Sequence, residues 1–315
     1  MSDRVRSLSG GVAAPRAWAG RQRRRAMLDA YLMLLPTILG VLIFFAVPLG
    51  VSLYLSFTDA RLAGATRVIG AANYLRALGD AKFRLALQNT VLLSLGTLVF
   101  SVPPALGLAL LLNRPLRGRT FFRGLFFVPV VASVVGIALV WRYLLNYDFG
   151  FVNYALSRLG LPRINWLNDP SVALWSVIIV VVWRTLGYNL VIFLAGLQNV
   201  PRQLYEAASI DGAGRWQQFR HITLPMLSPT TFFIVVTTLI NVLQEFPIPY
   251  ALGVTRSGAA GPADAMLTIV FYLYQQGFNS FRMGYASALA WLLFAMIMLV
   301  TLVQFAVSRR WVHYD

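Results

Sequence analysis

The sequence AYLMLLPTILGVLIFFAVPLGVSLYLSFT, residues 30–58, contains no Asp, Glu, Lys or Arg in 29 positions. A helix needs about 20 mostly apolar residues to cross the roughly 30 Å hydrocarbon core of a bilayer. The stretch also exceeds the apolar region of about 7 to 15 residues found in cleavable signal peptides. We therefore predict a permanent membrane helix here, although the basic run RQRRR precedes it at residues 21–25.

Five later segments repeat this pattern, and with the first they predict an all-α, polytopic membrane protein with six transmembrane helices. A seventh segment, residues 265–281, is apolar at first but short, and it ends in polar residues. We expect it to lie at the membrane surface or to dip into it. The five later predicted spans are residues 85–113, 124–145, 172–197, 230–250 and 283–308.

The composition of the whole chain supports this class. Among its 315 residues 58% are hydrophobic, the mean hydropathy is +0.67, and 12% are charged, where a soluble domain carries about 25%. An ordinary soluble enzyme is therefore excluded. The net charge of +16 could suggest a nucleic-acid partner, but the apolar residues are gathered into runs that no soluble core could bury. We expect no nucleic-acid partner.

The distribution of basic residues predicts the orientation, because Lys and Arg favour the cytoplasmic side of membrane proteins. If the N-terminus is cytoplasmic, sixteen of the 27 basic residues lie inside and ten outside, with Arg184 in a span. Both termini are then cytoplasmic. The predicted organisation is a disordered basic tail at 1–28 that touches anionic lipid, a first transmembrane helix at 29–58, an extracytoplasmic loop at 59–84, a core of five further spans at 85–308 and a cytoplasmic tail at 309–315.

Several kinds of chemistry are missing from the sequence. Its one lysine, Lys82, stands outside any phosphate-binding loop, so the chain cannot be an ATPase of the P-loop type. The two histidines, His221 and His313, have no carboxylate pair beside them, and there is no cysteine, so we expect neither a metal site nor a catalytic residue. Glu245 is the only acidic residue well inside a predicted span, which disfavours a proton-coupled carrier.

The loop between the fourth and fifth predicted spans has the sequence PRQLYEAASIDGAGRWQQFRHITLP, residues 201–225. It predicts a short helix that begins at Pro201 and stops at Gly212. Leu204, Ala207 and Ala208 share one face of that helix, where small side chains would let a partner approach the backbone, and Glu206 offers a charge. An amphipathic helix lying on lipid would explain the same pattern.

The pattern Glu-Ala-Ala-x2-Asp-Gly-Ala-x5-Phe-x2-Ile-x-Leu-Pro, which this chain matches from Glu206 to Pro225, resembles that of the permease subunits of binding-protein-dependent ABC importers. The resemblance implies that residues 200–226 form a cytoplasmic coupling segment that docks on a separate ATPase subunit. The docking residues that it implies are Leu204, Glu206, Ala207, Ala208, Asp211, Gly212 and Ala213.

Further residues are similar to those of carbohydrate permeases of the maltose type, with one departure at 254–262, where the chain is longer. This resemblance implies a bacterial inner-membrane importer of a sugar or oligosaccharide. Its partners would be two copies of an ATP-binding subunit that hold ATP and Mg, a second homologous permease forming a heterodimer, and an extracytoplasmic binding protein. The alternatives are the same machinery for another solute, such as glycerol phosphate, or a carrier that works alone. The residues that carry this similarity include Asn73, Tyr74, Asp80, Phe83, Asn89, Thr90, Arg123, Trp141, Asp148, Gly150, Asn153 and Trp166.

Polar residues inside membrane spans are costly and so are candidates for substrate contacts, and aromatic rings can lie against sugars. Interhelical hydrogen bonding or packing would explain each of these residues as well. The spacing of Asn241, Gln244 and Glu245 places them on one helical face. Straight helices would leave a vertical gap of about 10 Å between Arg184 and Glu245, so we expect Arg184 to face the polar interior without a direct salt bridge. The candidates are Trp183, Arg184, Tyr188, Asn189, Asn241, Gln244 and Glu245.

Overall fold

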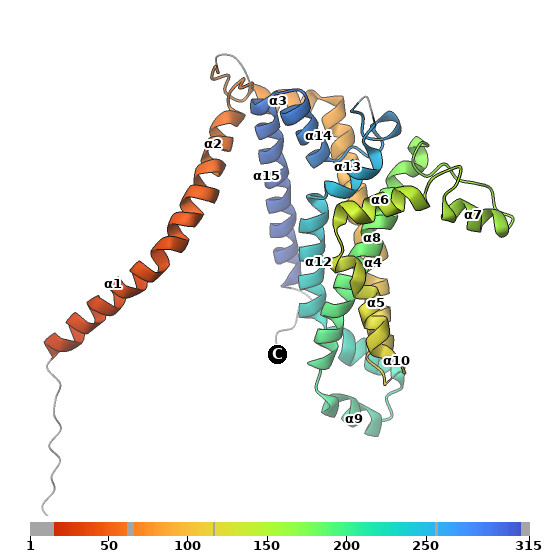
Figure 1. The fold of residues 1–315 in the computed structure, drawn as a ribbon. Helices are drawn as coiled ribbons and strands as arrows, with labels where there is room; N and C mark the ends of the chain where they lie inside the picture. Colours follow the sequence, from red (N-terminus) through yellow and green to blue (C-terminus); the bar gives the residue numbers. More distant parts are fainter. Residues whose placement is uncertain (1–15, 62–65, 116, 256–257, 310–315) are drawn as a thin grey trace, which may run out of the picture. The chain divides into compact units, whose positions relative to one another are not determined.

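The computed structural model describes residues 16–61, 66–115, 117–255 and 258–309. In these ranges the chain is helical and forms no strand beyond isolated bridges, which confirms the predicted all-α class. The chain divides into two compact units, residues 1–54 and 55–315 (Figure 1). Residues 1–15 of the predicted N-terminal tail and residues 310–315 of the predicted C-terminal tail lie outside the described ranges.

The first unit is one long helical segment. It consists of α1 (Arg16–Val41), a π-helical turn η1 (Leu42–Ala46) and the start of α2 (Val47–Ser56). The π-turn stands just before Pro48, whose ring and missing N–H disturb the regular helix hydrogen bonds. Residues 29–56 are long and apolar enough to cross a membrane, as predicted. Residues 16–28, predicted as part of a disordered tail, are helical.

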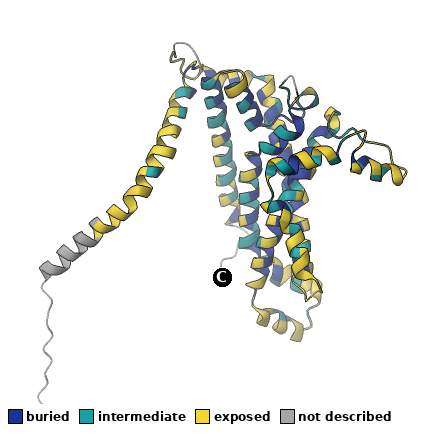
Figure 2. Ribbon diagram, viewed as in Figure 1, coloured by how far each residue is buried: buried dark blue, intermediate teal, exposed yellow. Residues whose placement is uncertain are grey.

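Three long helices of the second unit match the second, fourth and sixth predicted spans: α4 (Ala81–Leu112), α8 (Pro170–Gln198) and α15 (Met283–Ser308). Side-chain caps fix two of their starts. Asp80 accepts a hydrogen bond from the backbone N–H of Lys82 at 2.9 Å, and Asp169 accepts one from Ser171 at 2.9 Å. Helices α4 and α8 pack along each other, and their buried side chains form the centre of this unit (Figure 2).

The third predicted span, residues 124–145, is not one helix, and that prediction is corrected. The structure has α5 (Arg119–Val131) and α6 (Val134–Leu144), which meet at an angle of 102°. Pro129 removes a hydrogen-bond donor near the end of α5, and Ser133 starts α6 by accepting from the N–H of Gly136 at 3.4 Å.

The fifth predicted span, residues 230–250, is also interrupted. The helical stretch α10 (Arg215–Gln218), η2 (Phe219–Thr223) and α11 (Leu224–Met226) meets α12 (Ser228–Leu243) at a 61° bend, and α12 ends well before residue 250. Phe246 precedes Pro247, which starts α13 (Pro247–Gly253), and a residue before proline is disfavoured in the helical conformation. The described residues therefore contain four uninterrupted spans, or six if each bent pair crosses the membrane once.

The segment 265–281 is packed into the protein. It follows a short 3-10 turn, η3 (Pro262–Asp264), and forms α14 (Ile269–Tyr274) and a π-turn, η4 (Gln275–Asn279), against α4 and α15. The side chain of Asn89 donates to the carbonyl of Leu267 at 3.0 Å, and the backbone N–H of Ile269 donates to Thr90 Oγ1 at 2.9 Å. The first half of the segment is thus buried by neighbouring helices.

The two ends of the second unit differ. One end carries α9 (Arg202–Ile210) and α10, and the opposite end carries α3 (Ala72–Gly79), α13 and α14 (Figure 1). The short helix α7 (Phe151–Arg158) lies in the connection between α6 and α8.

A carboxylate organises the end that carries α3. Asp80 Oδ2 accepts hydrogen bonds from the hydroxyls of Tyr272 and Tyr285, which joins the start of α4 to α14 and α15. Burial raises the pKa of Asp80, but these bonds and the backbone N–H groups of Lys82 and Phe83 together hold it below its ordinary value. Nearby, Lys82 pairs with Asp264 at 2.8 Å. Asp80, Asn89 and Thr90, which resemble the permease pattern, thus have structural roles.

Gly187 of α8 provides a test of this packing. A Cβ atom at this position would lie 1.9 Å from the carbonyl oxygen of Phe126 in α5, whereas a Cβ at Gly107 of α4 meets nothing within 4 Å. We expect Gly187→Ala to cost about 1–3 kcal/mol through overpacking and to lower the melting temperature in detergent. Gly107→Ala is the matched control and should be neutral or slightly stabilising. Equal melting temperatures for the two variants would contradict the close contact between α5 and α8.

Candidate functional site

The helix α9 begins and ends near the predicted residues. Pro201 stands at its N-cap, and its last turn closes with two hydrogen bonds, from the N–H of Ala213 to the carbonyl of Ala208 at 2.8 Å and from the N–H of Gly212 to that of Ser209 at 3.2 Å. Gly212 has a φ of +78°, the left-handed conformation that this termination requires and that glycine adopts without strain. The predicted stop at Gly212 is confirmed.

The candidate docking residues lie together on α9 and the turn after it, and most are exposed (Figure 2). Glu206, Ala207, Asp211 and Gly212 are exposed, as is Leu204, while Ala208 and Ala213 are half-buried. Two exposed neighbours were not selected from the sequence: Ile210, 86% exposed, and Trp216, 69% exposed. Their signal in the sequence was a large apolar side chain among small and polar residues.

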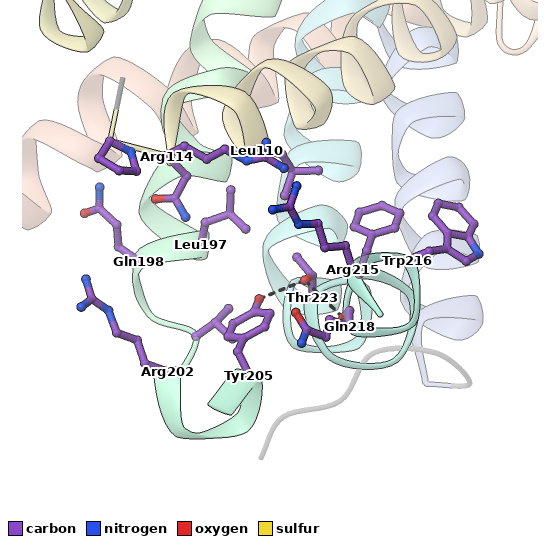
Figure 3. Close-up of a pocket in the computed structure, with 14 residues that line it drawn as sticks. Leu110, Arg114, Leu197, Gln198, Arg202, Tyr205, Arg215, Trp216, Gln218 and Thr223 are labelled. Atoms are coloured by element: carbon purple, nitrogen blue, oxygen red, sulfur yellow. Dashed lines mark hydrogen bonds between the residues drawn. The ribbon is translucent and has the colours of Figure 1, made fainter. Parts of the chain in front are cut away.

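Hydrogen bonds brace α9 against the helical stretch that follows it. The hydroxyls of Tyr205 and Thr223 lie 2.9 Å apart (Figure 3). Gln218 Nε2 donates to Ser209 Oγ at 2.9 Å. Leu227 alone separates that stretch from α12, the helix that carries Asn241.

The second group of candidates surrounds the end of α12, and one prediction about it is wrong. Asn241 and Gln244 are exposed, but Glu245 is buried, so the three do not share a face. The reason is that α12 ends at Leu243. Asn241 Nδ2 and Gln244 Nε2 donate to the backbone carbonyls one turn earlier, at 2.8 Å and 3.0 Å.

The prediction that Arg184 and Glu245 form no direct salt bridge is also wrong. Arg184 Nη1 lies 3.6 Å from Glu245 Oε2, with the side chains 28% and 6% exposed. The straight-helix estimate failed because Glu245 lies beyond the end of α12, in the link to α13. There Glu245 Oε1 accepts from the N–H of Ile248 at 3.3 Å, and its backbone carbonyl accepts from Thr268 Oγ1 at 3.3 Å.

The remaining candidates on α8 divide into two kinds. Trp183 meets Trp141 edge-to-face, with ring centroids 5.7 Å apart, beside an apolar cavity of about 370 Å³, and Tyr188 is exposed. Asn189 is fully buried. It donates to Ser101 Oγ at 3.3 Å and accepts from Thr238 Oγ1 at 3.3 Å, so its amide ties α8 to α4 and α12. We therefore assign Asn189 to helix packing rather than to substrate contact.

The part of the chain that the structure describes contains no cluster of three or more His, Cys, Asp or Glu side chains suited to a metal ion. The side chains at the two candidate sites offer hydrogen bonding, aromatic contact and charge.

Comparison with known proteins connects these features. Residues 91–313 match the family model described as "Binding-protein-dependent transport system inner membrane component". The chain is 39% identical to the probable ABC transporter permease protein YesP of Bacillus subtilis over 298 residues, covering 94% of this chain and 95% of that protein. It is 35% identical to the arabinooligosaccharides transport system permease protein AraP of the same species over 280 residues, covering 88% of each.

A solved structure has the same fold. It is a bacterial alginate ABC transporter in complex with an alginate pentasaccharide-bound periplasmic protein, and one of its chains superimposes with a TM-score of 0.78 at 28% identity. The match covers 94% of this chain and 98% of that one. With a family match over more than two thirds of its length and relatives of this similarity, the chain belongs to the inner membrane components of binding-protein-dependent transport systems, the permeases of ABC importers.

Proposed function

We propose that this chain is the permease subunit of an ATP-driven importer that takes up a sugar or oligosaccharide delivered by an extracytoplasmic binding protein. The observation that carries the proposal is α9, an exposed helix braced against the stretch leading into α12, in a chain that has no phosphate-binding loop of its own. A docking helix of this kind serves a separate ATPase.

The ATPase subunits would bind ATP and Mg, and this chain would contribute no catalytic residue. Their closure would push on the exposed surface of α9 that includes Glu206 and Ile210. The braced loop transmits this movement into α12, and the 61° bend at Leu227 is a joint at which that helix can change direction. This is alternating access driven from one end of the bundle.

A sugar suits the second site better than an ion does. Asn241 and Gln244 offer neutral hydrogen-bonding groups on an exposed face, Trp183 and Tyr188 offer aromatic surface, and the charge of Glu245 is balanced by Arg184. A second permease would cover this face and enclose the substrate between the two subunits. Relatives named for arabinooligosaccharide and alginate transport support the same class of solute.

The position of α9 also indicates which end of the second unit faces the cytoplasm. Since the ATPase must be cytoplasmic, the end that carries α9 faces the cytoplasm, and the bias of basic residues places both termini there too. The end that carries α3 and α13 would then face the binding protein.

The docking role can be tested with a double variant, Glu206→Gln with Gly212→Ala. It removes the charge of α9 and strains its left-handed terminal residue, so we expect co-purification of the ATPase subunits to fall at least about tenfold. Gly160→Ala is the matched control, because Gly160 also has a positive φ (+71°) and no atom within 4 Å of the added Cβ, yet lies after α7. A double variant that still assembles and couples ATP hydrolysis would refute docking through α9.

The substrate role predicts that Asn241→Ala with Gln244→Ala reduces the sugar-dependent ATPase activity of the assembled complex. Each lost hydrogen bond to substrate should cost about 0.5–1.5 kcal/mol, so uptake at low sugar concentration should fall by about tenfold. The measurement is stimulation by the loaded binding protein across a panel of sugars and glycerol phosphate. Stimulation by glycerol phosphate alone would overturn the choice of sugar while leaving the importer assignment intact.

The ion pair predicts a rescue. Arg184→Met leaves Glu245 buried without its partner and should destabilise the protein by about 3 kcal/mol, the low end for buried pairs because Arg184 is partly exposed. Adding Glu245→Met should restore much of the loss. Equal melting temperatures for the single variant and the wild type would show that the pair contributes nothing, and normal transport by stably folded Arg184→Met would show that transport does not need it.

A further inference from the structure

A cavity of about 1000 Å³ lies between the ends of two membrane helices and the coupling segment (Figure 3). The last residues of α4 and the turn after it form one wall, and the end of α8 forms another. Residues of α9 and α10 line the remaining side. This volume reaches the upper end of the range of about 300–1,000 Å³ found for ligand sites.

The lining of the cavity is strongly positive. Arg114 comes from the turn after α4, Arg202 from the first residue of α9 and Arg215 from the first residue of α10, so the three guanidinium groups come from three different segments (Figure 3). None of the lining residues is Asp or Glu. The ion pairs of the described chain, Lys82 with Asp264 and Arg184 with Glu245, involve none of these arginines. The cavity therefore has positive charge that nothing in its lining balances.

The position of the cavity indicates what supplies the negative charge. Leu110 and Leu197 stand in the last turns of α4 and α8, which are long enough to cross the bilayer, so the cavity lies at the depth where hydrocarbon gives way to lipid headgroups. Trp216 also lines it, and tryptophan favours this boundary. The exposed docking residues Glu206, Ile210 and Asp211 do not line it, so the ATPase-facing surface of α9 is a different surface.

We propose that this cavity is a binding site for an anionic phospholipid. Its phosphate is held by Arg114, Arg202 and Arg215, and the glycerol that carries its acyl chains lies against Leu110 and Leu197. Arginine suits this role because its guanidinium group can donate two parallel hydrogen bonds to phosphate. The bound lipid would bridge the ends of α4 and α8 to α9, and it would thereby stabilise the coupling segment. The proposal does not depend on which solute is transported.

The test uses the assembled importer, purified in detergent with phosphatidylglycerol added in steps, without sugar or binding protein. Native mass spectrometry counts the phosphatidylglycerol molecules retained by the wild type and by the triple variant Arg114→Gln, Arg202→Gln, Arg215→Gln. A basic residue near an anionic lipid contributes about fivefold in affinity, so the triple variant should retain the lipid at least about tenfold more weakly. If the triple variant does not assemble, each single variant should show about a fivefold loss.

The matched control is Arg119→Gln, Arg220→Gln, Arg309→Gln, which removes the same charge from exposed arginines that do not line the cavity. It should retain the lipid as the wild type does. Equal weakening in both triple variants, or wild-type retention in the cavity variant, would overturn the proposal. So would displacement of the lipid by inorganic phosphate at matched concentration, which would make the cavity a site for soluble phosphate. Normal lipid retention combined with loss of the ATPase subunits would instead make it part of the protein interface.

Discussion

Within a bilayer, a backbone N–H or carbonyl without a partner costs several kcal/mol, and the architecture of this permease depends on how it meets that constraint where helices stop. The link between α12 and α13 is the clearest case. Glu245 accepts the N–H of Ile248 through its carboxylate and the hydroxyl of Thr268 through its backbone carbonyl, while Arg184 balances its charge. One residue thus satisfies the start of α13, joins it to the segment before α14 and connects both to α8. The break between α12 and α13 is therefore stabilised by specific contacts of Glu245.

That break also positions the candidate substrate groups. Because α12 stops at Leu243, Gln244 stands at the helix end with Asn241 one turn earlier, both exposed, while Glu245 turns into the protein. A continuous helix would have placed the carboxylate beside the two amides and made the face acidic. The interruption separates a neutral hydrogen-bonding surface from a structural ion pair, and the same helix is linked through α11 and η2 to the docking segment. The candidate substrate face and the candidate docking helix are therefore connected through α12.

Many residues that mark the permease pattern make hydrogen bonds that join separate segments of the fold. Asp80 receives two tyrosine hydroxyls, Asn89 caps carbonyls before α14, and Asn153 donates to the carbonyl of Ile164 and accepts from Trp166 Nε1 in the connection after α6. Asn189 acts in the same way inside the bundle. A buried amide or carboxylate that satisfies several partners at once specifies one arrangement of helices, which explains why such residues are tied to the fold.

The sequence by itself determined the all-α class, the four uninterrupted spans and the limits of α9, because those features depend on local properties: runs of apolar residues, caps such as Asp80 and Asp169, and a glycine at the left-handed end of a helix. It also indicated the candidate docking surface, since Glu206 and Gly212 belong to a contiguous motif. Only the tertiary structure decided that α5 and α6 meet at 102° and that Arg184 pairs with Glu245. It also decided that the amide of Asn189 is hydrogen-bonded to Ser101 and Thr238. The cavity that Arg114 shares with Arg202 and Arg215 is likewise visible only in the structure. Each of these depends on residues far apart in the chain and on the direction that the chain takes after a helix stops, and neither hydropathy nor spacing encodes that direction.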